Sequence, residues 1–194
     1  GVPSKDVVSI AGSESVAISP KTFIGVKPKR MVSEGDSVLI GSPLFFDKTK
    51  PEVKWASPAN GTIKTIQFGA RRVIEKIEIK VEGTEAVSGS SFTSEQLVSA
   101  DRTTILTRIL EANLFPLIRQ RPFNKVANPK DTPRDIFISA VNTAPLSVDL
   151  SLLIEKEKNE FQAGVIALSK LTNGDVFLTS EKGHQFQNSI NQTI

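Results

Sequence analysis

Two stretches in the first half of the chain, residues 62–66 and 74–81, alternate apolar and polar side chains almost strictly. Successive side chains of a β-strand point to opposite faces, so this period of two is typical of strands with one buried face and one wet face. Shorter apolar runs, separated by glycine and proline turns, occur at residues 7–10, 15–18, 37–40, 44–46 and 53–56. The pattern predicts a β-rich module, to which we assign residues 1–90.

The period of the apolar residues changes after residue 90. Thr93 stands three residues before Gln96, which is the spacing of a helix capping box, and an apolar stripe at helical spacing follows. An extended stretch comes next, in which regular helix is excluded by Pro116, Pro122, Pro129 and Pro133. The sequence therefore predicts short helices and then a segment held extended by prolines.

A strand, a helix and a second strand complete the chain. Residues 135–141 are almost wholly apolar, as expected for a strand buried on both faces. A helix is expected from about Leu150 to the Asn173-Gly174 pair, followed by a strand at residues 175–179. The inward side of that helix is expected to carry Phe161, Val165, Leu168 and Thr172. This is the order of a βαβ unit, so residues 91–194 are predicted to form a Rossmann-like α/β domain with a parallel sheet and a right-handed crossover, incomplete at its C-terminus.

Composition removes several classes of function. Without cysteine the chain has no disulfide, thiolate nucleophile or cysteine-bound metal centre. Its one histidine, His184, lies in a polar tail, and the sequence contains no G-x-S-x-G motif whose serine this histidine could activate. Lysines and arginines (24) nearly balance the acidic residues (21) and interleave with them, which argues against nucleic acid as a partner. No signal peptide and no membrane-spanning run is visible, so a soluble protein is expected.

Two turn motifs mark the β-rich half: E-G-D-S-V at residues 34–38 and S-P-A-N-G-T-I at residues 57–63. Each glycine stands where a tight turn requires a positive φ. The pair resembles the barrel-sandwich hybrid of biotinyl and lipoyl carrier domains, in which a lysine between the two turns receives the prosthetic group. Lys48 or Lys50 occupies that interval here. The alternative is a plain exposed hairpin lysine, because the Met-Lys pair of a biotin site is absent.

A basic and aromatic loop, R-Q-R-P-F-N-K at residues 119–125, is the second candidate site. Two arginines, a phenylalanine and a lysine in an extended loop suit an aromatic or anionic ligand, which they would hold by stacking and charge. The same residues equally suit a surface that docks on a neighbouring protein. The residues alone leave both interpretations open.

Longer strings carry a resemblance to a known family. They are F-I-G-V-K-P (23–28), E-G-D-S-V (34–38), L-F-F-D-K (44–48), V-K-W-A-S-P-A-N-G (53–61), G-A-R-R-V (69–73), R-Q-R-P-F-N-K-V (119–126) and I-F-I-S-A-V (136–141). On these residues the chain resembles the NqrA family, one of the component chains of the bacterial sodium-translocating NADH:quinone oxidoreductase. Members of that family are about twice as long, so the resemblance implies an N-terminal fragment.

The wider superfamily includes the flavin-carrying NADH subunit of respiratory complex I, which has a glycine-rich flavin loop and an acid-rich turn. Here L-F-P-L-I at residues 114–118 stands in place of the glycines, and Asn142 and Ala144 stand in place of the acids. Bulky side chains would keep a flavin away from the backbone, and the carboxylates that would bind NADH are missing. The resemblance therefore implies no cofactor in this subunit, with FMN and NADH bound by other subunits of the complex.

The same resemblance implies a peripheral subunit on the cytoplasmic face of the bacterial inner membrane, in a membrane-embedded complex that oxidises NADH, reduces ubiquinone and exports sodium. Its expected role is quinone binding and complex assembly, and alone it is expected to be catalytically inert. The candidates for a quinone surface are Phe23, Arg119, Arg121, Phe123 and Lys125. A cation would bond a quinone oxygen and Phe123 would stack on the ring; otherwise the loop docks on the membrane subunits. Two alternatives are a carrier module that uses Lys48 or Lys50 and a working FMN/NADH-binding subunit.

Overall fold

The structure is a computed structural model that describes residues 6–145 and 147–180. It divides into two compact units. Ile10–Ser90 and Leu106–Asp131 form the first, which we call the barrel unit. The second, the α/β unit, contains the described residues 6–9, 91–105, 132–145 and 147–180. His184 and the polar tail around it lie outside the described residues.

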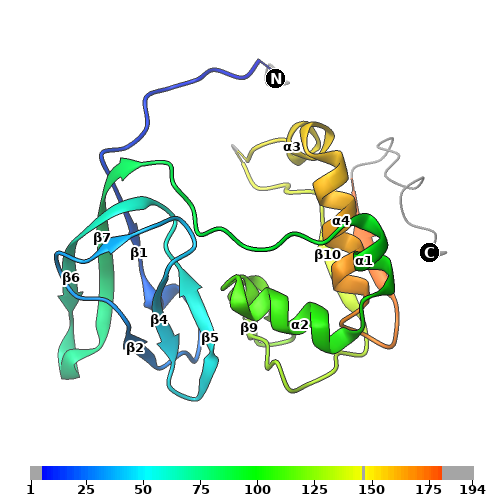
Figure 1. Ribbon diagram of the computed structural model, residues 1–194, viewed down its shortest axis with the longest axis horizontal. Coiled ribbons are helices and arrows are strands. Elements are labelled where there is room, and N and C mark those ends of the chain that lie inside the picture. The colour runs from blue at the N-terminus through cyan, green and yellow to red at the C-terminus, as the bar shows by residue number, and fades with distance from the viewer. Residues whose placement is uncertain (1–5, 146, 181–194) are drawn as a thin grey trace. The chain divides into compact units, whose positions relative to one another are not determined.

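Two facing antiparallel sheets make up the barrel unit (Figure 1). The first has the strand order β1-β7-β6-β3 and the second the order β2-β4-β5. The strands are β1 (Ser15–Ile18), β2 (Pro28–Arg30), β3 (Ser37–Val38), β4 (Pro43–Asp47), β5 (Lys50–Ala56), β6 (Asn60–Phe68) and β7 (Ile74–Gly83). Two single turns of 3-10 helix connect strands, η1 (Pro20–Thr22) and η2 (Ala70–Arg72).

The alternating stretches form the longest pair of strands, β6 and β7. Ile63 lies opposite Ile79, and both are almost fully buried, as is Ile77. The intervening Lys64 and Glu78 lie on the other face and bond to each other. The strand predictions at residues 62–66 and 74–81 are therefore confirmed, because a period of two places every second side chain in the core.

The predicted glycine turns are also confirmed. Gly35 and Gly41 have φ angles of 88° and 94°, values that favour glycine. Gly61 has a φ of 154° and lies against the carbonyl of Lys80 on β7, so a side chain at this position would overlap the neighbouring strand.

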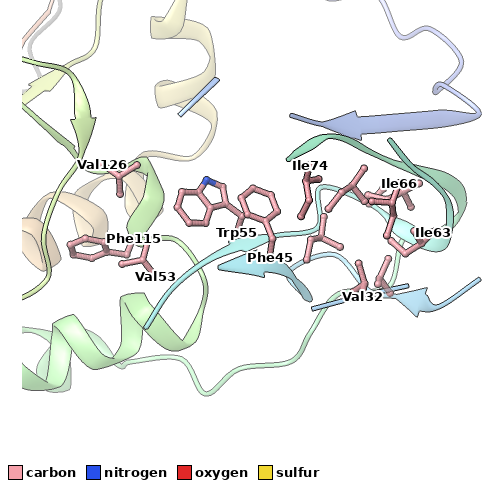
Figure 2. Close-up of a cluster of buried hydrophobic side chains, with 14 residues drawn as sticks. Val32, Phe45, Val53, Trp55, Ile63, Ile66, Ile74, Phe115 and Val126 are labelled. Carbon is pink, nitrogen blue, oxygen red and sulfur yellow. The ribbon is translucent and has the colours of Figure 1, made fainter. Parts of the chain in front are cut away.

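A later segment of the chain packs into the core of the barrel unit. Helix α2 (Arg102–Glu111) ends in this unit and is followed by η3 (Phe115–Leu117) and by the hairpin of β8 (Arg119–Gln120) and β9 (Lys125–Val126). Figure 2 shows Phe115 and Val126 beside Val53, at the end of the hydrophobic cluster opposite Ile63 and Ile66. The domain assignment 1–90 and 91–194 stays a prediction, and the compact units are assembled differently, because residues 106–131 bury apolar side chains with the barrel.

The α/β unit contains α1 (Ser94–Ser99), β10 (Ile136–Ser139), α3 (Leu150–Lys156), α4 (Lys158–Ser169) and β11 (Val176–Thr179). Strands β10 and β11 pair in parallel, as the predicted βαβ order requires. Thr93 and Gln96 form the predicted capping box at the start of α1. Helix α4 buries Val165, one of the predicted inward residues.

Four details of the sequence-based prediction were wrong. Residues 7–10 form no strand, and their apolar side chains lie exposed. The strand expected at 37–40 ends at Val38, because the Ile40 N–H donates instead to the Glu85 carbonyl. Strand β10 is not buried on both faces, since Phe137 is 70% exposed and stacks on Phe177. The single helix expected to reach Gly174 is broken at Glu157, whose backbone is non-helical, and ends at Ser169.

Candidate functional site

The hairpin β8–β9 carries the basic and aromatic loop. Arg119 pairs with Val126 and Gln120 pairs with Lys125, so residues 121–124 form the connection between the strands. Asn124 adopts a φ of 50°, in the left-handed region that asparagine tolerates better than most residues. The local sequence therefore favours a tight hairpin whose base is held by the buried side chain of Val126.

One hydrogen bond extends this hairpin, and two further hydrogen bonds fasten it to β5. The Ala127 N–H donates to the Ile118 carbonyl at 3.0 Å and extends the pairing by one step. The ammonium of Lys50, at the start of β5, donates to the carbonyls of Val126 and Ala127, both at 3.2 Å. A residue of the first half of the chain thus bonds directly to the backbone at the base of the hairpin.

A column of stacked groups runs from the hairpin into the core. The Arg119 guanidinium carbon lies 4.9 Å from the centre of the Phe23 ring, a cation–π distance. The Phe23 ring meets the Trp55 indole edge-on, with centres 5.2 Å apart and planes at 69°. The indole in turn stacks on Phe45 at 4.9 Å and 11°. Figure 2 shows this stacked Trp55–Phe45 pair in the middle of the hydrophobic cluster.

The five candidate residues fall into a half-buried group and an exposed group. It brings Arg119 and Phe23, which are 96 positions apart in the sequence, into direct contact, and both are half-buried. Arg121, Phe123 and Lys125 lie exposed on the loop and at the start of β9, and Phe123 has 71% of its surface accessible. The arrangement offers a cation–aromatic pair, Arg119 on Phe23, together with two exposed cations and an exposed ring on the same hairpin.

Trp55 and Phe45 belong to this column, and sequence reasoning missed both as site residues. The signal that points to Trp55 is that it is the one tryptophan of the chain and lies in the string V-K-W-A-S-P. The indole is 2% exposed, and its Nε1–H finds no hydrogen-bond acceptor within the described residues. A buried donor of this kind is uncommon in proteins.

The two candidate carrier lysines differ in their surroundings. Lys48 lies exposed in the turn between β4 and β5, with its backbone N–H bonded to the Lys27 carbonyl. Lys50 is half-buried, and modification of its ammonium would break its bonds to the hairpin. The geometry leaves Lys48 as the more accessible of the two.

The positions that replace a flavin loop and an acid-rich turn have local structural roles. Phe115 is 4% exposed and belongs to the core of the barrel unit, and Pro116 beside it is buried as well. Asn142 accepts a hydrogen bond from the backbone N–H of Ala144 at 3.1 Å through its side-chain oxygen, which closes a short turn. Within residues 6–145 and 147–180 no group of three or more His, Asp or Glu is arranged to hold a metal ion.

Among the described residues, the largest shift in pKa is that of Glu78, on the sheet formed by β6 and β7. The Glu78 carboxylate accepts hydrogen bonds from the ammonium groups of Lys64, at 2.8 Å, and of Lys76, at 2.9 Å. These bonds lower the pKa of Glu78 to about 2. The residues belong to a charged strand face, not to the aromatic column, and we assign them a role in stability.

No helix within the described ranges combines the length and the apolar character that crossing a bilayer requires. Comparison with known proteins identifies the family to which the chain is similar. The model of the NqrA N-terminal barrel-sandwich hybrid domain matches residues 1–82, and that of the NqrA second alpha/beta domain matches residues 100–194. The matches agree with the two facing sheets and the parallel strand pair described above, and they confirm the predicted fold class.

Curated relatives match over nearly the whole chain. The NqrA chain of the Na(+)-translocating NADH-quinone reductase of Saccharophagus degradans is 36% identical over 94% of this chain and 41% of its own length. The corresponding proteins of Marinomonas sp. and Vibrio atlanticus are 32% and 34% identical over 100% of this chain and 44% and 43% of their own lengths. The chain thus spans less than half the length of these relatives. On both family models and these relatives, the chain belongs to the NqrA family, of which it carries the N-terminal barrel-sandwich hybrid domain and the second alpha/beta domain.

Proposed function

We propose that this chain is part of the NqrA component of a sodium-translocating NADH:quinone reductase, and that its barrel unit supplies a quinone-binding surface at Phe23 and the hairpin of residues 119–126. The names of the relatives support the first statement. The placement of the Arg119 guanidinium over the Phe23 ring, beside the exposed Arg121, Phe123 and Lys125, carries the second. In this role the chain takes no catalytic step by itself.

The chemistry of a quinone suits this surface. A quinone is a planar ring with two carbonyl oxygens that gain negative charge on reduction, so it is bound best by aromatic faces and cationic donors together. Phe123 offers an exposed ring, and Arg121 and Lys125 are donors on the same hairpin. Arg119, whose guanidinium lies over the Phe23 ring, is a third cationic donor of this hairpin and is half-buried.

The proposal also assigns this chain no flavin, and places FMN and NADH on other subunits. The support is local: the side chain of Phe115 stands where a flavin loop would need glycine, and it is committed to the hydrophobic core. A peripheral position on the cytoplasmic side of the inner membrane, in contact with membrane-embedded subunits, belongs to the same proposal. Addition of FMN to the purified chain is expected to produce no bound, shifted flavin absorption band, and a stoichiometric flavin complex would contradict this part.

A carrier function is the second candidate, because Lys48 lies exposed at the β4–β5 turn. A biotinyl or lipoyl group on this lysine would add its mass to the chain isolated from its native host. An intact mass equal to that of the unmodified sequence would remove the carrier function. A mass increment that disappears in Lys48→Arg would establish it.

The quinone surface is tested by titrating the isotopically labelled chain with a short-chain, water-soluble ubiquinone and following the backbone amide resonances. Saturable shifts are expected at Phe23 and residues 119–126, and none at the charged face of β6 and β7, which serves as an internal control. The absence of any saturable shift at millimolar quinone would contradict quinone binding by this chain.

A further inference from the structure

The Trp55 indole N–H is a hydrogen-bond donor that has no acceptor among the residues described. The residue is 2% exposed, and its Nε1–H is buried without an acceptor within the described part of the chain. Figure 2 shows the nitrogen on the edge of the indole that faces away from β5. Loss of a hydrogen bond by a buried N–H is costly, whereas a phenylalanine at this position would stack on Phe45 without that cost.

The immediate neighbours of the indole cannot satisfy this donor well. Phe45 stacks on its face at 11°, and Phe23 meets it at 69° with ring centres 5.2 Å apart. An aromatic ring is at best a weak acceptor for an N–H group. An oxygen atom from outside the described chain would therefore be a better partner than either ring.

Phe23 connects this donor to the surface. It is half-buried, it touches the indole, and it carries the Arg119 guanidinium on its ring. The next residues are exposed and include Gly25 with a φ of 78°, so Phe23 belongs to a surface loop and not to a strand. Phe23 is therefore the side chain that contacts both the Arg119 guanidinium and the Trp55 indole.

We propose that the Trp55 indole N–H is the hydrogen-bond donor for one carbonyl oxygen of the quinone, with the quinone ring entering between Phe23 and the hairpin and Arg119 facing the second polar edge of the ligand. This inference rests on the proposed function and deepens it, because it assigns a specific donor inside the core to the ligand. Trp55 then is a binding residue, and the exposed Arg121, Phe123 and Lys125 form the entrance.

The chain has one tryptophan, so a ¹⁵N-labelled sample gives one indole resonance. Titration with short-chain ubiquinone is expected to move this indole proton downfield and to slow its exchange with solvent, with the same midpoint as the amide shifts of the hairpin. The control ligand is a benzene that keeps the ring substituents of the quinone and has hydrogens in place of its two carbonyl oxygens. It is expected to leave the indole proton near its starting position.

A second measurement uses Trp55→Phe, which keeps an aromatic ring for Phe45 and removes the N–H. The expected result is a roughly five- to tenfold weaker affinity for the quinone, the effect of one hydrogen bond, and an unchanged affinity for the ligand that lacks the two carbonyl oxygens. Lys29→Ala is the control variant, because it removes the cation that lies over the Phe46 ring elsewhere in the same unit. Its quinone affinity is expected to equal that of the wild type.

The outcomes separate this inference from the proposed function. Saturable hairpin shifts with a stationary indole proton, or equal quinone affinities of the wild type and Trp55→Phe, would overturn the role of Trp55 and leave the quinone surface standing. An indole proton that is already downfield and protected without ligand, and does not respond to quinone, would show a buried water as its partner and would also overturn it. No response of either hairpin or indole would overturn the proposed quinone surface, and this inference with it.

Discussion

Lys50 bonds through its ammonium to the carbonyl oxygen of Val126, 76 positions later in the chain, at 3.2 Å. The same ammonium bonds the Ala127 carbonyl at 3.2 Å, so one side chain satisfies two backbone acceptors at the base of the β8–β9 hairpin. The hairpin that carries Arg119, Phe123 and Lys125 is therefore part of the barrel unit through polar contacts as well as through Phe115 and Val126.

Lys50→Met is expected to lower the free energy of unfolding by about 1–3 kcal/mol, because two partly buried carbonyl groups lose a charged donor. Lys48→Met, which changes an exposed lysine two positions away, is expected to change it by less than about 0.5 kcal/mol. Urea denaturation of the two variants measures the difference. Equal midpoints for both would mean that the bonds from Lys50 contribute nothing to stability.

Gly61→Ala is expected to destabilise the barrel unit by at least about 2 kcal/mol, since the new methyl group would overlap the Lys80 carbonyl on β7 at a φ of 154° that favours glycine. Gly12→Ala is the control, because a methyl group there meets no atom within 4 Å. Thermal unfolding of both variants checks this. A Gly61→Ala protein as stable as the control would contradict the described β6–β7 spacing.

The pKa of Glu78 predicts a pH dependence of stability. Hydrogen bonds from Lys64 and then Lys76 lower this pKa from its ordinary value of 4.5 to about 2. A carboxyl group whose pKa is lower in the folded state stabilises that state above pH 4.5 and loses the contribution as the pH falls toward 2. Between these pH values, Glu78→Gln is expected to flatten the fall in the free energy of unfolding, measured by urea titration at each pH. Parallel curves for the wild type and Glu78→Gln would disprove the shift.

Thr93→Ala is expected to destabilise helix α1 by about 1 kcal/mol, because the Thr93 hydroxyl accepts from the Gln96 N–H and the Gln96 side chain accepts from the Thr93 N–H. Thr103→Ala, at an exposed position inside α2, is expected to be neutral or slightly stabilising. Hydrogen exchange of the α1 amides measures the effect. The same protection in the wild type and Thr93→Ala would mean that the cap does not hold the helix.

Arg119→Ala is expected to weaken the binding of short-chain quinone about tenfold, because it removes a charged group that the structure holds beside the proposed ring site. Lys29→Ala removes the other cation described over a ring of this unit, at Phe46, and is expected to bind quinone like the wild type. Affinities come from the amide titration. An equal loss in both variants would point to a general effect of net charge.

Local patterns in the sequence predicted much of the fold. The alternation at residues 74–81 predicted β7, and the Thr93–Gln96 spacing predicted the start of α1, because each depends on neighbours within a few residues. The parallel pairing of β10 and β11 followed from their separation by a helix. Where the local pattern was weak, it misled: the apolar side chains at residues 7–10 suggested a strand, yet those residues pair with no strand in the structure.

The candidate site shows the opposite case. The family resemblance grouped Phe23 with Arg119 and the rest of the loop as candidates for one quinone surface, but no pattern in the sequence connected either residue with Trp55. Their contact accompanies the packing of Phe115 and Val126 into a core made by strands from the first half of the chain. The role of these residues in quinone binding stays a prediction.

The sequence by itself thus determined the alternating strands β6 and β7, the glycine turns of the barrel unit and the start of helix α1, since hydrogen bonding and side-chain alternation over short distances decide them. Only the tertiary structure decided that residues 106–131 join the barrel unit, that Arg119 covers Phe23, and that the Trp55 indole N–H is buried without an acceptor among the residues described. These outcomes depend on which apolar surfaces bury one another across the chain. That choice is made by the free energy of the whole core and leaves no short-range pattern in the sequence.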